Sequence, residues 1–84
     1  MSEKEIMDRL KSIVKPYAQR QEGLDNFEES TDFINDLEIN SANLVDVVLD
    51  VEDEFNIEID NDSMEGMLTV GDAKSIIQNK LKHP

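Results

Sequence analysis

Apolar residues near the N-terminus recur at helical spacing. The recurring positions are Ile6, Leu10, Ile13, Val14 and Tyr17. Ser2 precedes them, with Glu5 three residues later, which is the capping-box pattern of a helix start. The pattern predicts a helix over residues 3–19. Pro16 lies inside that range and removes one backbone hydrogen bond, so we expect the last turn to bend or the helix to end sooner.

Residues 20–40 show no sustained hydrophobic period. Their apolar residues are Leu24, Phe27, Phe33, Ile34 and Leu37. We expect a long loop with one short turn near Thr31, because a loop of this length in a compact domain is usually functional or held by its own side chains. Phe27, Phe33 and Leu37 are the side chains that we expect to hold it.

The most apolar helical segment covers residues 42–55, and Ser41 stands in the position of a standard N-cap. At about 100° per residue, one arc of this helix collects the apolar residues of a normal buried stripe. These are Leu44, Val47, Val48, Val51 and Phe55. A second apolar stripe consists of Ala42, Val45 and Leu49, beside the acids Asp46, Asp50 and Asp53. A buried helix needs only the first stripe, so the second requires another explanation.

The segment after this helix is short and irregular. Residues 56–59 alternate like a strand, but one four-residue segment has no partner strand, so we expect a loop with both isoleucines facing inward. A short irregular turn of helix is expected over residues 62–67, with Met64 and Met67 inward as core fillers.

Thr69 and Asp72 form a second capping-box pattern, ahead of a final helix. Its inward residues are expected to be Val70, Ala73, Ile76, Ile77 and Leu81. The periodicity along the chain therefore predicts an all-α fold of three major helices and one short helix, with a long loop between the first two major helices. At 84 residues, the chain is long enough for one domain, residues 1–84.

Charge is distributed unevenly along the chain, whose net charge is −12. Residues 21–72 hold 17 acids and no base, while all the lysines and arginines lie nearer the two ends. Such a segment repels phosphate backbones and anionic lipid headgroups, which argues against binding to nucleic acid or to a membrane surface. It favours a basic partner, although a solvated acidic surface is the simpler alternative.

Composition removes several kinds of active site. The chain has no cysteine, and its one histidine is His83, so thiol nucleophiles, zinc sites and histidine-based catalytic centres are not expected. Residues 60–66 begin like a calcium loop, but Met64 and Glu65 stand where an acid or asparagine and a glycine are needed. We therefore expect no metal. No segment reads as a leader or a membrane span, and we expect a soluble, cytoplasmic monomer.

Ser41 admits three interpretations. As a catalytic nucleophile it lacks an identifiable base, so the chain is not expected to be an enzyme. As a helix cap it would be ordinary. As a modified hydroxyl it would benefit from the helix N-terminus, whose free amides and dipole favour an attached phosphate.

The segment FINDLEINSANLVDVVLDVEDEFNIEI, residues 33–59, resembles the acyl carrier protein family. The residues that match the family pattern are Phe33, Asp36, Leu37, Ser41, Val45, Asp46, Val48, Leu49, Glu52, Asp53, Glu54, Phe55, Glu58 and Ile59. The likeness continues through residues 67–70 into the final helix, so it covers nearly the whole chain.

The resemblance implies a small helical bundle in which Ser41 carries 4′-phosphopantetheine, transferred from coenzyme A by a phosphopantetheinyl transferase. The thiol of that arm forms thioesters with acyl groups. Helix 42–55 would be the recognition helix for acyl-transferring, synthase or ligase enzymes with basic docking patches. The residues implied to contact such partners are Ala42, Val45, Asp46, Leu49, Asp50, Glu52 and Asp53.

The attachment motif departs from the usual family pattern. Asn40 replaces an aspartate, Ala42 replaces a leucine, and Glu38 with Ile39 replaces a small Gly-Ala pair. These departures suggest a specialised carrier, in fatty-acid, polyketide or another lipid or secondary-metabolite synthesis. Two alternatives stay open: an aminoacyl or peptidyl carrier, and an acidic helical adaptor that carries no phosphopantetheine.

Overall fold

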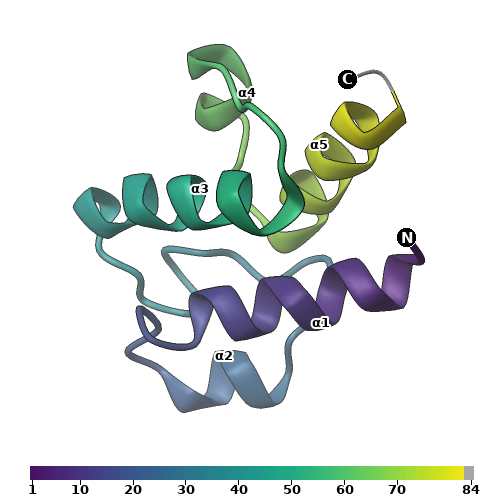
Figure 1. The fold of residues 1–84 in the computed structure, drawn as a ribbon. Helices are drawn as coiled ribbons and strands as arrows, with labels where there is room; N and C mark the ends of the chain where they lie inside the picture. Colours follow the sequence, from purple (N-terminus) through teal and green to yellow (C-terminus); the bar gives the residue numbers. More distant parts are fainter. Residues whose placement is uncertain (83–84) are drawn as a thin grey trace.

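The computed structural model describes residues 1–82, and five helices account for most of them (Figure 1). The helices are α1 (Glu3–Val14), α2 (Gln21–Asp25), α3 (Ser41–Phe55), α4 (Asn61–Glu65) and α5 (Val70–Lys82). Within this range, extended pairing is limited to one isolated bridge between Asp32 and Thr69. The predicted all-α class and its three long helices are confirmed. His83, considered as a catalytic or zinc-binding residue, lies outside the described residues.

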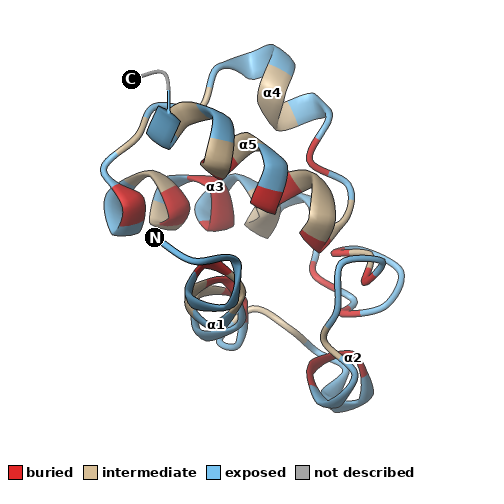
Figure 2. Ribbon diagram, turned by 90° about the vertical axis from the view of Figure 1, so that its right-hand side faces the viewer, coloured by how far each residue is buried: buried red, intermediate tan, exposed pale blue. Residues whose placement is uncertain are grey.

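The three long helices enclose the core. α1 packs against both α3 and α5, while α2 and α4 lie at opposite ends of the molecule (Figure 1). Figure 2 shows that the buried residues of the long helices lie on the sides that face one another. The largest fully buried side chains are Phe33, Ile6, Leu10, Leu37, Ile39, Met67, Ile77, Val14, Val47, Val51 and Val70. Val48, Phe55 and Ala73 are also buried, so each apolar stripe predicted to face inward contributes to the core. Leu81, predicted to face inward at the end of the final helix, is exposed instead.

The capping box of Thr69 and Asp72 forms in full, and the one of Ser2 and Glu5 makes one of its two hydrogen bonds. The Ser2 hydroxyl accepts a hydrogen bond from the Glu5 amide at 3.1 Å. At the start of α5, the Asp72 amide donates to the Thr69 hydroxyl at 3.2 Å, and the Thr69 amide donates to the Asp72 carboxylate at 3.1 Å. These bonds satisfy amides that a helix start leaves unpaired.

α1 ends at Val14, so the helix predicted over residues 3–19 is too long. Pro16 has no amide hydrogen to continue the ladder. The chain turns instead, and the amides of Tyr17 and Ala18 both donate to the Val14 carbonyl at 2.9 Å. The side chain of Tyr17 therefore leaves from a turn instead of from a helix face.

α2 was not predicted, because its five residues contain too little of a period to detect. Its buried residues are Gly23 and Leu24. A Cβ at Gly23 would collide with the backbone carbonyl of Asp36, so only glycine allows α2 to lie this close to the following loop. The short turn of helix predicted over 62–67 forms as α4, which begins one residue earlier and ends two residues earlier.

The connection between α2 and α3 is anchored as predicted at two of its three apolar side chains. Phe33 and Leu37 are fully buried, and Phe27 is partly buried against the same core. Backbone hydrogen bonds also join the connection to the start of α5 and to Leu68, two residues before α5. They run from Phe33 to Leu68 at 3.1 Å, from Val70 to Thr31 at 2.9 Å and from Gly71 to Glu29 at 2.8 Å.

Lys74 supplies a buried positive charge that the sequence patterns did not reveal. Its ammonium group lies 2.7 Å from a Glu29 carboxylate oxygen and 3.1 Å from one of Glu3. The hydrogen bond to Glu29, followed by the one to Glu3, raises the pKa of Lys74. The hydrogen bond to Lys74 lowers the pKa of Glu3. One side chain of α5 therefore joins α1 and the α2–α3 connection.

Lys74→Met should lower the melting temperature at neutral pH, because it leaves two carboxylates without their shared cation. The deficit should shrink in acid. Since the folded-state pKa of Glu3 is lowered, its contribution is present above the ordinary carboxylate pKa, roughly 4, and is lost as the pH falls through the folded value. Melting curves of Lys74→Met and of the exposed control Lys82→Met test this. Equal deficits in the two variants, or a deficit that grows in acid, would contradict the role of Lys74.

Candidate functional site

Asn40, and not Ser41, caps α3. The backbone of Asn40 is extended, and its side-chain oxygen accepts a hydrogen bond from the Ala42 amide at 2.8 Å. Its carbonyl accepts from the amides of Asn43 at 2.8 Å and Leu44 at 3.1 Å. The expectation that Ser41 is the N-cap, with the helix starting at 42, is therefore wrong. Either residue type is a good cap, and only the backbone geometry decides between them.

Ser41 is therefore the first residue of α3, and its hydroxyl does not cap the helix. The residue is exposed, and the first turn of α3 contains no acid. The positive end of the helix dipole lies at this point, where an attached phosphate is electrostatically favoured. The residues present therefore fit a phosphate-containing group on the Ser41 oxygen.

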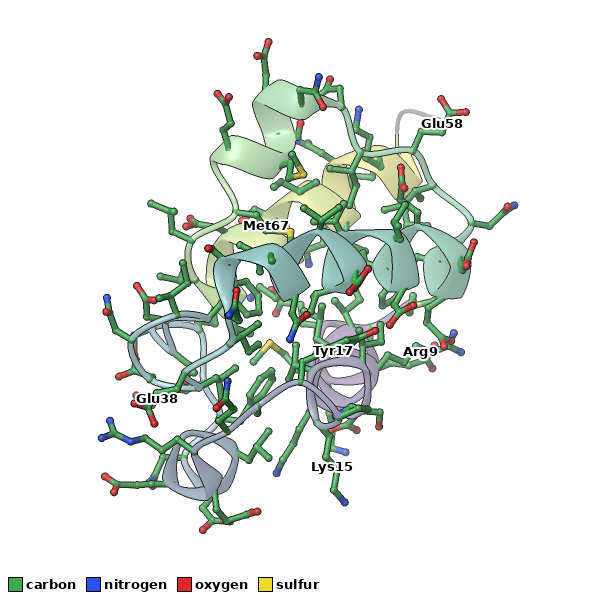
Figure 3. All side chains as sticks on the ribbon, turned by 90° about the vertical axis from the view of Figure 1, so that its left-hand side faces the viewer. Arg9, Lys15, Tyr17, Glu38, Glu58 and Met67 are labelled. Atoms are coloured by element: carbon green, nitrogen blue, oxygen red, sulfur yellow. The ribbon has the colours of Figure 1, made fainter. Side chains whose placement is uncertain are left out.

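The chain is held firmly just before this serine. Ile39 is buried, and its amide donates to the Phe33 carbonyl at 3.0 Å. Glu38, labelled in Figure 3, has a φ of 53°, a left-handed conformation that is uncommon for residues other than glycine. Its carboxylate lies 3.7 Å from the guanidinium of Arg20. These contacts set the direction in which the chain enters α3.

The two apolar stripes of α3 have different environments, as their spacing predicts. The first stripe faces the core: Val47, Val48, Val51 and Phe55 are buried, and Leu44 is partly buried against them. The second stripe faces solvent, where Val45 is 48% exposed and Leu49 is 53% exposed. Ala42, Asp46 and Asp53 are also exposed. We call Ala42, Val45, Asp46, Leu49 and Asp53 the outer face of α3.

The two remaining acids considered for this surface have partners inside the protein. An Asp50 carboxylate oxygen accepts a hydrogen bond from the Tyr17 hydroxyl at 2.7 Å. A Glu52 carboxylate oxygen accepts one from the Ile59 amide at 2.7 Å, which holds the α3–α4 connection against α3. Sequence reasoning placed Tyr17 on the apolar side of a longer helix and so missed its contact with Asp50.

The segment that begins like a calcium loop has a structural role instead. The Asp60 carboxylate accepts from the Ser63 amide at 2.8 Å and caps α4, and its hydrogen bonds to Ser63 lower the pKa of Asp60. Residues 1–82 contain no group of three side chains placed to hold a metal ion. None of the helices in this range is long and apolar enough to cross a membrane.

Comparison with known proteins gives a consistent result. A family model described as a phosphopantetheine attachment site matches residues 8–75. The acyl carrier protein of Lactobacillus acidophilus is 40% identical over 79 residues, which cover 94% of this chain and 96% of that protein. The acyl carrier protein of Thermotoga maritima is 38% identical over 82 residues, covering 95% and 96%.

A solved structure of the acyl carrier protein from Enterococcus faecalis has the same fold. It matches with a TM-score of 0.77 at 26% identity and covers 95% of this chain and 99% of its own. The helical fold is thus that of a phosphopantetheine-attachment domain. The chain belongs to the acyl carrier protein family. It is a carrier without catalytic activity, and its prosthetic group is 4′-phosphopantetheine.

Replacing the cap residue and replacing the serine should have different effects on stability. Asn40→Ala should lower the free energy of unfolding by about 1 kcal/mol, because the Ala42 amide loses its partner. Ser41→Ala should change it by no more than about 0.5 kcal/mol, as expected for an exposed residue with no capping role. Urea unfolding of both variants measures the difference. Equal costs, or a larger cost for Ser41→Ala, would show that Asn40 is not the cap.

Proposed function

We propose that Ser41 is the attachment site of 4′-phosphopantetheine and that the chain delivers acyl groups to partner enzymes through α3. The observation that carries this proposal is the exposed Ser41 side chain in the first turn of α3, with the capping task performed by Asn40. When bound, the arm supplies a terminal thiol that holds acyl groups as thioesters.

The Ser41 oxygen would form the new bond to phosphorus as the pyrophosphate linkage of coenzyme A breaks. The nucleotide leaves as adenosine 3′,5′-bisphosphate, and the serine proton passes to a base of the phosphopantetheinyl transferase. The chain's own contribution is positional. Asn40 keeps the first turn of α3 formed, and the helix dipole lowers the energy of the phosphodiester anion next to it.

The outer face of α3 supports a docking role. Exposed Val45 and Leu49 provide apolar contact area, and Asp46 and Asp53 provide charge beside it. Charges at the rim of such a contact steer the encounter and set the orientation of the partners, while each adds modest affinity. The surface therefore suits transferases, synthases, acyl-transferring enzymes or ligases that present basic patches and must exchange quickly.

The attachment turn favours a specialised carrier. Glu38, Ile39 and Asn40 each have structural tasks here, and Ala42 offers little apolar area to a partner. The pathway we propose is fatty-acid, polyketide or another dedicated lipid synthesis, in which the chain acts as a cytoplasmic monomer. An aminoacyl or peptidyl cargo is the alternative. An acidic adaptor without the arm would use the same face of α3, and modification of Ser41 separates it from a carrier.

Incubation with coenzyme A and a phosphopantetheinyl transferase should add the mass of one phosphopantetheine. Ser41→Ala should abolish the gain, because it removes the nucleophilic oxygen. Ser12→Ala replaces another exposed serine, on α1, and should retain it. Intact-mass spectrometry provides the measurement. A wild-type chain that stays unmodified with several transferases, including one from its own source, would favour the adaptor.

Charge reversal on the outer face of α3 should weaken the encounter with the transferase. Asp46→Lys combined with Asp53→Lys should raise the KM for the carrier roughly tenfold or more, and the effect should diminish at high salt. Glu22→Lys combined with Asp25→Lys on α2, far from α3 in Figure 1, adds the same charge, is the matched control and should leave KM nearly unchanged. If the two double variants change KM equally, only the net charge matters and the proposed face is wrong.

A further inference from the structure

Tyr17 connects the turn after α1 to the acidic side of α3. Its hydroxyl donates to an Asp50 carboxylate oxygen at 2.7 Å, in a partly buried contact between residues 33 positions apart. Figure 3 shows the Tyr17 side chain between α1 and α3. Hydrogen bonds to ionised groups are shorter and stronger than those between neutral groups. The contact therefore restricts the position of the Asp50 carboxylate.

Backbone hydrogen bonds before and after Tyr17 position its side chain for this contact. Before it, the turn that replaces the last turns of α1 is closed by the amides of Tyr17 and Ala18 on the Val14 carbonyl. After it, the amides of Gln19 and Arg20 donate to the Leu37 carbonyl at 2.9 and 3.3 Å. With its backbone held at both ends, the tyrosine has little freedom to leave α3.

Asp50 is the middle member of a row of three acids on α3. Asp46, Asp50 and Asp53 are spaced by four and three residues, which places them on one side of the helix. The hydrogen bond to Asp50 is the largest cause that raises the pKa of Tyr17, and the charges of Asp50 and Asp46 add to it. The phenol therefore lies in the field of two members of the row.

We propose that Tyr17 is a positioning residue of the docking surface. It holds the Asp50 carboxylate between Asp46 and Asp53, the two acids that meet the partner's cations. The inference rests on the function proposed above. An array of charges that is already ordered loses less entropy when a basic partner binds. The docking surface thus extends from the outer face of α3 onto the turn between α1 and α2.

Tyr17→Phe tests this directly, because it keeps the ring and every charge but releases Asp50. At a temperature where the variant is fully folded, its KM with the transferase should rise about threefold or more, with kcat unchanged. Asp50→Asn should raise KM similarly, and the double variant should raise it no further than either change alone. A tyrosine that only stabilises the fold would leave KM unchanged.

Glu54→Gln is the matched control. It also removes one charge from α3 and breaks a contact with α1, the 2.8 Å ion pair of Glu54 with Arg9, but Glu54 is not part of the row. It should lower the melting temperature and leave KM nearly unchanged. If it raises KM as much as Asp50→Asn does, loss of charge or of stability explains both effects, and the proposal is wrong.

Direct titration checks the hydrogen bond itself. The chain has one tyrosine, so the ultraviolet absorbance change on ionisation reports on Tyr17 alone. Asp50→Asn should lower the pKa of Tyr17 towards its ordinary value, and an unchanged pKa would mean that the bond does not form in solution. A wild-type chain that gains no phosphopantetheine overturns both proposals. A modified wild type with an unaltered KM in Tyr17→Phe overturns only this one.

Discussion

The acidic middle of the chain is held to the rest of the fold by a few cations that come from its two ends. Residues 21–72 contain 17 acids and no base, so every ion pair that they make within the chain must reach outside the segment. The pairs that do so are Arg9 with Glu54, Arg20 with Glu38, Lys74 with Glu29 and Lys80 with Asp60. Lys74 differs from the others because its side chain is only 10% exposed, which reduces screening by solvent. Folding therefore brings the ends of the chain onto its middle for electrostatic as well as hydrophobic reasons.

This arrangement also determines which acids remain for a partner. Arg9 on α1 pairs with Glu54 on α3. Lys74 and Lys80 on α5 pair with Glu29 and Asp60, which lie in the connections before α3 and before α4. Asp46 and Asp53 lie on the exposed side of α3 and face solvent. The ion pairs that hold the fold and the charges available for docking thus come from different sides of one acidic segment. At the docking face that we propose, a partner's basic patch would approach Asp46 and Asp53 without competing with these ion pairs.

Hydrophobic spacing predicts those parts of this fold in which an apolar pattern repeats over several helical turns. The three long helices, the Ser2 cap, the capping box of Thr69 and Asp72 and the exposed second stripe of α3 follow from local sequence. The end of α1, the short helix α2 and the contact of Tyr17 with Asp50 do not, because each depends on tertiary neighbours. The candidate site is only partly predictable from the sequence. The pattern locates Ser41 at a helix start, but Asn40 and Ser41 are both good cap residues. Only the extended backbone of Asn40 shows which of them performs that role.

Because Asn40 caps α3, the Ser41 oxygen is not needed for capping, which bears on the proposed modification of Ser41. A serine that capped its own helix would have its oxygen engaged with an amide, and esterification would compete with that bond. Here the cap belongs to the preceding residue, whose position depends on buried Ile39 and on the left-handed turn at Glu38. A left-handed non-glycine residue costs on the order of 1 kcal/mol, so this turn is maintained against a local penalty. The attachment that we propose at Ser41 would therefore leave the first turn of α3 formed.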